Sequence, residues 1–319
     1  MEKGNLTATR ELVLLGLPGS SAHPHVLATL FLCMYLVAVS GNTLMVLAVW
    51  GDSRLHSPMY LFLGHLAFVD VCFVSTTVPK MAVNLLTGTS TITLAGCLAQ
   101  LFFFISFVNM DSLLLCAMAY DRYMAICHPL RYAALVSPWL CLRLVAGLWA
   151  LAGLHALLHT LLMARLSFCA SSVIHHFFCD LHPLLQLSCS DVSLNVMVIL
   201  SVGAPLALTP LAGILTSYGL ILCTILKLTS TRGKQRAFST CSGHLSLVVL
   251  FYGSATAVYF SPASPHTPEG DALSAAVYAV VTPMLNPFLY SLRNREVKVA
   301  LQKVLCEPLS AATATRDGS

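Results

Sequence analysis

The sequence predicts an all-α protein, a bundle of seven transmembrane helices with a short amphipathic C-terminal helix on the membrane surface. Composition, the number of long apolar runs and the placement of basic residues predict this fold. Of the 319 residues, 57% are hydrophobic and only 9% are charged, whereas a soluble domain carries about a quarter charged residues. Membrane lipid is therefore the expected solvent. Nucleic-acid binding is not expected, because the basic residues form short clusters beside apolar runs rather than a continuous stripe.

Seven apolar runs are long enough to cross a hydrocarbon core of about 30 Å, which takes about 20 helical residues. They cover residues 26–50, 58–78, 97–119, 140–164, 196–226, 245–263 and 272–292. We predict an extracellular N-terminus over residues 1–25 and a seven-transmembrane domain over 26–292. The apolar residues of 293–306 share one helical stripe, which predicts an amphipathic helix. The small, polar residues of 307–319 predict a disordered cytoplasmic tail.

Basic residues set the expected orientation, because short loops rich in Lys and Arg stay in the cytoplasm. With the N-terminus outside, only four of the 17 Lys and Arg residues fall on the outer side. These are Lys3, Arg10, Lys80 and Arg165. The expected location is the plasma membrane, with the C-terminus in the cytoplasm. Asn5, in the sequon Asn5-Leu6-Thr7, is then a candidate glycosylation site.

Four of the 12 cysteines are expected on the oxidising outer side, where disulfides persist. Cys97 begins the third span, and Cys169, Cys179 and Cys189 lie in the loop between the fourth and fifth spans. Four cysteines allow three pairings, and the residues alone do not choose among them.

Ionisable residues inside predicted spans are functional candidates, because a charge at membrane depth is costly without a partner. Asp70 lies in the second span and Asp111 in the third, and Asn42 and Asn286 can join them. Together they predict a small hydrated cluster able to hold a sodium ion or to share a proton. The alternative is that these groups only hold helices together by hydrogen bonds.

Arg122 lies three helical turns beyond Asp111, so both side chains are expected on one face of the third span. At the cytoplasmic end, Arg122 can pair with its neighbour Asp121 while the bundle is closed and be released toward a partner when it opens. This arrangement predicts a conformational switch.

The outer half of the same face predicts an apolar pocket, to which the fifth and sixth spans contribute. The candidate ligand-binding residues are Phe104, Ile105, Val108, Asn109, Val202, Leu206, Tyr252, Ala255 and Tyr259. A small, weakly polar ligand fits better than an amine, because the outer half of the third span has no carboxylate. The alternative for each residue is ordinary helix packing.

Histidines raise the alternative of a metal site, because His155 and His159 share a helical face and His175 and His176 lie near Cys179. We expect hydrogen-bonded or exposed histidines, and predict no metal site.

A transporter or channel would also place polar groups at mid-membrane, but the chain lacks an inverted repeat and a charged relay. No nucleophile and base constellation indicates an enzyme.

Five motifs in order resemble the odorant receptors, a branch of the rhodopsin-like G-protein-coupled receptors. They are LHSPMY at 55–60, MAYDRYMAIC at 118–127, SY at 217–218, AFSTCSGHL at 237–245 and PMLNPFLYSLRN at 283–294. The resemblance covers nearly the whole chain. Asp111, where the family commonly has glutamate, Gly243, where serine is usual, and His65, where asparagine is common, depart from the pattern.

The resemblance implies a receptor for a small volatile odorant that activates the stimulatory olfactory G protein and raises cyclic AMP. It implies the disulfides Cys97–Cys179 and Cys169–Cys189. It assigns the activation switch and G-protein coupling to Asp121, Arg122, Tyr123, Tyr218, Asn286, Pro287 and Tyr290. Beyond the ion near Asp70 and Asp111 no cofactor is expected; membrane lipid and trafficking chaperones are the other expected partners.

Overall fold

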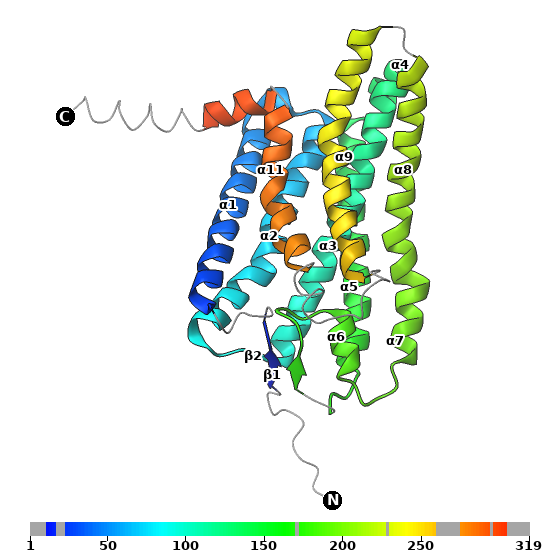
Figure 1. Ribbon diagram of the computed structural model, residues 1–319. Helices are drawn as coiled ribbons and strands as arrows, with labels where there is room; N and C mark the ends of the chain where they lie inside the picture. The colour runs from blue at the N-terminus through cyan, green and yellow to red at the C-terminus, as the bar shows by residue number, and fades with distance from the viewer. Residues whose placement is uncertain are drawn as a thin grey trace, which may run out of the picture.

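The computed structural model describes residues 11–16, 23–169, 172–227, 230–259, 275–293 and 296–304. Seven long helical segments cross the molecule side by side and form a bundle (Figure 1). They are α1 (Pro24–Gly51), α2 (Pro58–Thr87), α3 (Leu94–Cys127), α5 (Pro138–Ala164), α7 to α8 (Ser193–Lys227), α9 (Thr231–Tyr259) and the segment that ends in α11 (Thr282–Arg293). The predicted fold class is confirmed. By length and composition, five of these helices in the described chain, α1, α2, α3, α5 and the α7 to α8 segment, are apolar enough to cross a membrane.

Helix starts follow from local sequence signals. α1, α2 and α5 each begin with a proline, whose missing N–H group is not needed in the first turn. At the start of α5 the Ser137 hydroxyl accepts a hydrogen bond from the Leu140 N–H group at 3.2 Å, and Thr93 caps α3 in the same way. α2 ends at Thr87 and is capped by Gly88, whose φ of 68° suits a residue without a side chain.

Several helices extend beyond the predicted spans. α2 continues through Pro79 to Thr87, and α3 continues to Cys127. α9 begins at Thr231, not at residue 245, so its first turns are polar and basic. The predicted spans were shorter because an apolar run marks only the residues that cross the hydrocarbon core. A helix can continue into the polar region as long as its backbone hydrogen bonds continue.

Two π-helical stretches interrupt the bundle. Ile199–Gly203 (η2) lies between α7 (Ser193–Val198) and α8 (Ala204–Lys227), and Val277–Val281 (η3) precedes α11. A π-helical turn inserts one extra residue and rotates the side chains that follow. The direction of the fifth-span side chains therefore differs from that of an uninterrupted α-helix.

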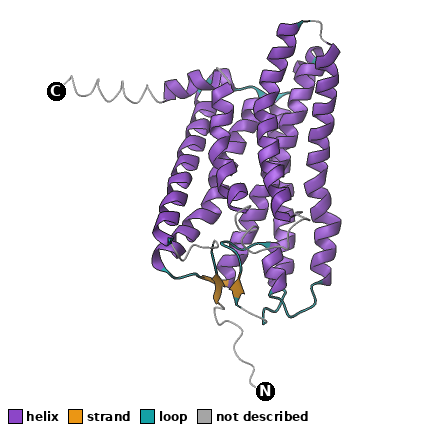
Figure 2. Ribbon diagram, in the orientation of Figure 1, coloured by secondary structure: helices purple, strands orange, loops and turns teal. Residues whose placement is uncertain are grey.

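A small sheet, which the sequence did not predict, covers one end of the bundle (Figure 2). Its central strand β1 (Glu11–Leu14) pairs antiparallel with β2 (Thr91–Thr93) and parallel with β3 (Val173–Ile174). Leu12 and Leu14 are 0% and 1% exposed, because they point from the sheet into the core. The N-terminal segment is thus part of the folded structure from residue 11 to 16.

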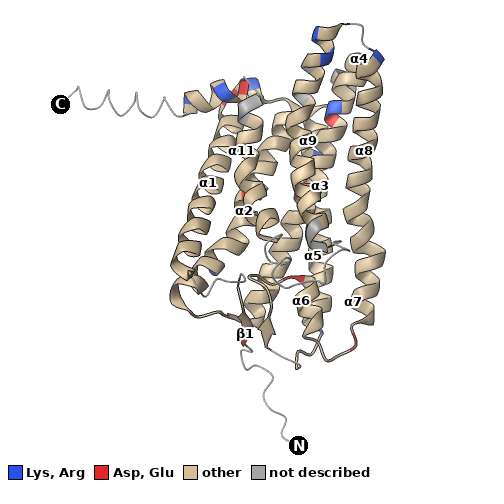
Figure 3. Cartoon of the chain, viewed as in Figure 1, with Lys and Arg blue, Asp and Glu red and all other residues tan. Residues whose placement is uncertain are grey.

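The opposite end of the bundle carries most of the basic side chains (Figure 3). There, residues 296–304 form a helix that turns away from the bundle axis (Figure 1). Val297 and Ala300 of this helix are buried in a cluster with Met45, Leu55 and Tyr60. Asn5 and the predicted tail at 307–319 lie outside the described residues.

We expect Leu12→Ala to lower the free energy of unfolding by about 2–5 kcal/mol, because it removes a fully buried side chain from the contact between sheet and bundle. Thermal unfolding of the detergent-solubilised protein measures the change. Leu15→Ala is the matched control, because Leu15 is 50% exposed. Equal melting temperatures for the two variants would show that β1 contributes nothing to stability.

Candidate functional site

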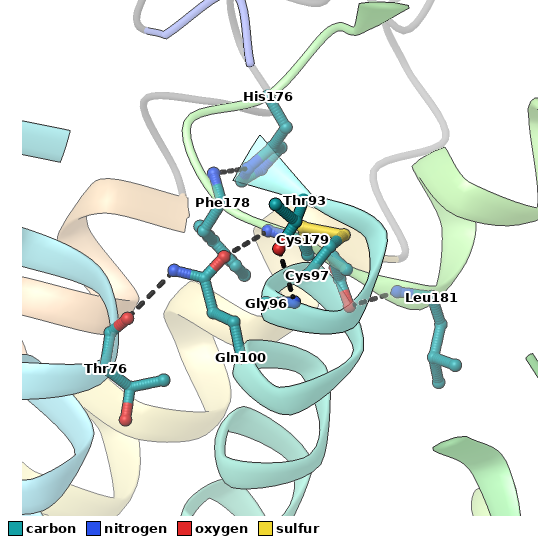
Figure 4. Close-up of a disulfide and its surroundings, with 10 residues drawn as sticks. Thr76, Thr93, Gly96, Cys97, Gln100, His176, Phe178, Cys179 and Leu181 are labelled. Atoms are coloured by element: carbon teal, nitrogen blue, oxygen red, sulfur yellow. Dashed lines mark hydrogen bonds between the residues drawn. A yellow bond between two sulfur atoms is a disulfide. The ribbon is translucent and has the colours of Figure 1, made fainter. Parts of the chain in front are cut away.

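The loop that follows α5 is fixed to α3 by a disulfide between Cys97 and Cys179, whose Cα atoms are 5.5 Å apart (Figure 4). Gln100, one turn further along α3, accepts a hydrogen bond from the Cys179 N–H group at 2.9 Å and donates one to the Thr76 carbonyl of α2 at 2.9 Å. A second disulfide joins Cys169 to Cys189 within the loop. These are the two pairings that the resemblance implies. The first ties the loop to α3, and the Gln100 hydrogen bonds extend this connection to α2.

Beneath this loop, aromatic rings fill the space between α2, α3 and the seventh segment. The Phe104 ring lies 5.3 Å from that of Phe73 and 4.6 Å from that of Phe178 in the loop, between ring centroids. Tyr278 contacts both Phe73 and Phe104. Phe104 is thus an interior residue on α3, and Ile105 beside it is also buried.

Deeper along α3, polar side chains join it to its neighbours. Ser112 and Tyr252 of α9 share a hydrogen bond of 2.7 Å between their hydroxyl groups. Asn109 donates to the Ile105 carbonyl at 2.8 Å and contacts His155 of α5 at 2.9 Å. These bonds place a few polar groups in an apolar interior, which is the chemistry of a site for small ligands.

The structure divides the predicted ligand-binding residues. Val108 and Ala255 are partly buried and pack against the main core with Tyr252. Val202 and Leu206 instead line a separate cavity, whose other walls come from α5 and Leu113. The structure thus does not bring Val202 and Leu206 together with Phe104, and the π-helical turn at Ile199–Gly203 alters the helical phase on which that prediction rested. The Tyr259 side chain lies outside the described residues.

Side chains from α1, α2, α3 and α11 contribute to the buried polar cluster. Asn286 donates a hydrogen bond of 2.7 Å to Asp70, and Asn42 donates to the Pro283 carbonyl at 2.9 Å. Asp111 lies close enough to Asp70 for their charges to interact. Within the described chain, one oxygen each of Asp70, Asp111 and Asn286 is buried without a hydrogen-bond partner. Carboxylate and amide oxygens are the ligands that hard cations prefer, so their chemistry fits a sodium ion.

At the basic end, Asp121 accepts a hydrogen bond of 2.7 Å from Tyr132 in α4 (Pro129–Leu135). Burial, and then this bond, raise the pKa of the Tyr132 hydroxyl above its usual value, so the phenol remains a donor at neutral pH. Arg122 contacts the sulfur of Met59. The predicted ion pair between Arg122 and Asp121 is not formed among the described residues, and Tyr132 is the hydrogen-bond donor to this carboxylate instead.

The other predicted switch residues lie near Arg122 or in the seventh segment. Tyr218 of α8 is hydrogen-bonded to His244 Nδ1 of α9 at 2.8 Å, and the two rings are stacked. Tyr290 donates to the Met118 sulfur at 3.8 Å, and Tyr123 contacts His128 at 2.9 Å.

Pro287 packs on Gly41 of α1. A methyl group at Gly41 would lie 3.1 Å from the proline ring, so this contact favours glycine. The contact joins the first and seventh segments beside the polar cluster.

Sequence reasoning missed three residues of this site. Gln100, Ser112 and His244 are all at least partly buried and hydrogen-bonded to another segment. His244 lies within the motif at 237–245, so the sequence indicated its position on the sixth span but not that Tyr218 is its hydrogen-bond partner. A polar residue inside an apolar span was the usable signal for Gln100 and Ser112, since such groups need partners in lipid.

Comparisons with known proteins identify the class and then the family. Squid rhodopsin, a solved structure, superposes with a TM-score of 0.72 over 93% of this chain and 88% of its own at 17% sequence identity, which shows a shared seven-helix fold. A family model described as olfactory receptor matches residues 31–308. Human olfactory receptor 1C1 is 69% identical over 96% of this chain and 97% of its own length, and rat olfactory receptor 1f45 is 53% identical over 96% and 97%. The chain therefore belongs to the olfactory receptor family, whose members are membrane receptors and not enzymes.

Proposed function

We propose that the chain is an odorant receptor that binds small, mostly apolar ligands within the helix bundle and activates a stimulatory olfactory G protein, raising cyclic AMP. The observation that carries this proposal is the continuity of α3. Phe104 lies among aromatic rings near its outer end, Ser112 bonds to α9, and Arg122 lies at the basic end. One rigid helix thus joins the interior to the surface where a partner can bind.

The ligand site that we propose comprises Phe104, Ile105, Val108, Asn109, Tyr252, Ala255 and Tyr259. Its chemistry suits a volatile molecule with one weakly polar group, because the only polar groups among these residues are the Asn109 amide and the two tyrosine hydroxyls. Asn109 and Tyr252 are already hydrogen-bonded to protein groups. A ligand that binds the open bundle more tightly than the closed one would shift the population toward signalling.

We propose that the N-terminus is extracellular and the basic end cytoplasmic. The gathering of Lys and Arg at the end opposite the sheet supports this orientation (Figure 3). The two disulfides at the sheet end also support it, since disulfides persist on the oxidising side. The cytoplasmic end of α3, with Asp121, Arg122 and Tyr123, then faces the G protein.

We expect Arg122→Ala to abolish the cyclic AMP response to any odorant that activates the wild type, because the cationic group at the coupling surface is lost. Cells expressing the olfactory G protein are tested against a panel of diverse odorants at matched surface level. Arg143→Ala is the control, since Arg143 is an exposed arginine on α5. A normal dose response from the Arg122 variant would contradict the coupling role.

We propose that a sodium ion binds at Asp70, Asp111 and Asn286, where buried oxygens lack partners in the described chain. Asp70→Asn removes a charge and keeps the shape, so we expect it to eliminate the dependence of odorant potency on sodium concentration. The potency is measured in sodium and in choline buffers of equal ionic strength. Retention of the wild-type sodium dependence would exclude Asp70 as a ligand.

The Tyr218–His244 hydrogen bond joins α8 to α9, and we propose that it stabilises the closed state. His244→Phe keeps a ring and removes the bond. A bond of about 0.5–1.5 kcal/mol predicts a rise in the open-to-closed ratio of about two- to tenfold, and thus higher basal cyclic AMP.

His65→Phe is the matched control for this variant, because His65 bonds only to the Leu61 carbonyl of its own helix in the described chain. Unchanged or lower basal signalling in the His244 variant, at equal surface level, would show that the bond does not restrain the bundle.

A further inference from the structure

A cavity of about 610 Å³ lies between α3, α5 and α8, apart from the aromatic interior. Its walls are mostly apolar, leucine is the commonest residue in them, and several of these side chains are directed outward. Leu154 is 67% exposed and Val202 is 42% exposed, so the cavity opens on the outer surface of these transmembrane helices. Its natural occupants are therefore molecules that first dissolve in the membrane.

Two hydroxyl groups lie in the wall of this otherwise apolar cavity. Ser201 and Thr209 line the cavity and have no side-chain hydrogen bond to the rest of the described chain. Serine and threonine in these helices commonly donate to the carbonyl four residues earlier, as Thr216 does to Ala212 at 2.8 Å. A donor left unpaired in lipid is costly. The two free hydroxyls thus favour an occupant that accepts a hydrogen bond.

The backbone explains why the cavity forms here. The π-helical turn at Ile199–Gly203 changes the register of the helix, and Pro205 and Pro210 follow within two turns. Pro210 has no N–H group to donate to the Leu206 carbonyl, as an α-helix would require. The same stretch therefore combines an irregular backbone, which is frequent at functional sites, with both free hydroxyls.

The His155 side chain forms part of the wall, and its hydrogen bonds define its tautomer. The Asn109 nitrogen that contacts His155 Nδ1 at 2.9 Å also donates to a carbonyl, so it is a donor and Nδ1 is an acceptor. His155 then carries its proton on Nε2 and donates to His159 Nε2 at 3.0 Å. Both ring nitrogens are occupied, so His155 links the wall to α3 and leaves recognition to Ser201 and Thr209.

We propose that this cavity is a second, membrane-facing binding site for a chain-like, neutral lipophile with a carbonyl oxygen, such as a medium-chain ketone or ester. Ser201 and Thr209 are eight residues apart, about 12 Å along a helix, so the oxygen of an elongated molecule can meet one hydroxyl while its alkyl part extends toward the other. The leucine side chains bind its alkyl part, and a hydroxyl donates to its oxygen. This site does not depend on where the activating odorant binds.

Photolabelling tests the proposal in the full chain, reconstituted in phosphatidylcholine vesicles. The probe is a ten-carbon ketone with a photoreactive diazirine, and the comparison probe is the hydrocarbon with the same diazirine. Labelled peptides are identified by mass spectrometry. We expect the ketone to label residues 151–158 and 201–210 about two- to tenfold more than the hydrocarbon does, as one hydrogen bond predicts.

The double variant Ser201→Ala with Thr209→Val should reduce ketone labelling to the hydrocarbon level. Thr216→Val is the control, because its hydroxyl is exposed on the same helix but already paired. A competition in the wild-type protein, which needs no variant to fold, should show excess unlabelled ketone displacing the probe and excess alkane failing to do so. Equal labelling by both probes, equal competition by ketone and alkane, or unchanged labelling of a folded double variant would overturn the proposal and indicate a groove for acyl chains.

Discussion

The absence of water in the bilayer core governs this structure, because every polar group at membrane depth must find its partner within the protein. The backbone meets this requirement by forming helices, and most side chains meet it locally. Ser40, Ser75, Ser106 and Thr216 all donate to carbonyls of their own helices. Fewer of the described polar groups bond to another helix, and several of these belong to the candidate site. Asn42, Asn109, Ser112 and Asn286 belong to this second group.

Several interhelical bonds converge on α3. Gln100 joins it to α2 and to the loop, Asn109 to α5 and Ser112 to α9. Rigid interiors transmit displacement because close-packed side chains cannot deform gradually. A change in the outer half of α3 is therefore felt by α5 and α9, and through α9 by the Tyr218–His244 contact. This network gives the proposed ligand site a physical route to the basic end.

The sequence was sufficient to predict the seven helices, because long apolar runs have few other structures available to them. It was also sufficient to identify Asp70, Asp111 and Asn286 as buried polar residues. It could not predict β1, because a run of four residues is too short to specify a strand by itself and depends on β2 and β3, which are distant in the chain. Nor could helical phase place Val202 and Leu206, since a π-helical turn shifts the phase without a clear mark in the sequence.

Asp121 illustrates why a motif predicts where a residue lies in the fold better than which residue it bonds to. Its place at the end of α3 follows from the sequence, and its expected partner was the adjacent arginine. In the structure Tyr132, eleven residues further on, supplies the hydrogen bond. Adjacent residues of a helix diverge by about 100° and rarely face each other, whereas α4 folds back to present its phenol to the carboxylate. Arg122 then rests on a thioether instead of a carboxylate. An arginine held by a weak acceptor requires less energy to release than one held by a buried ion pair, because no carboxylate is left unpaired when it moves.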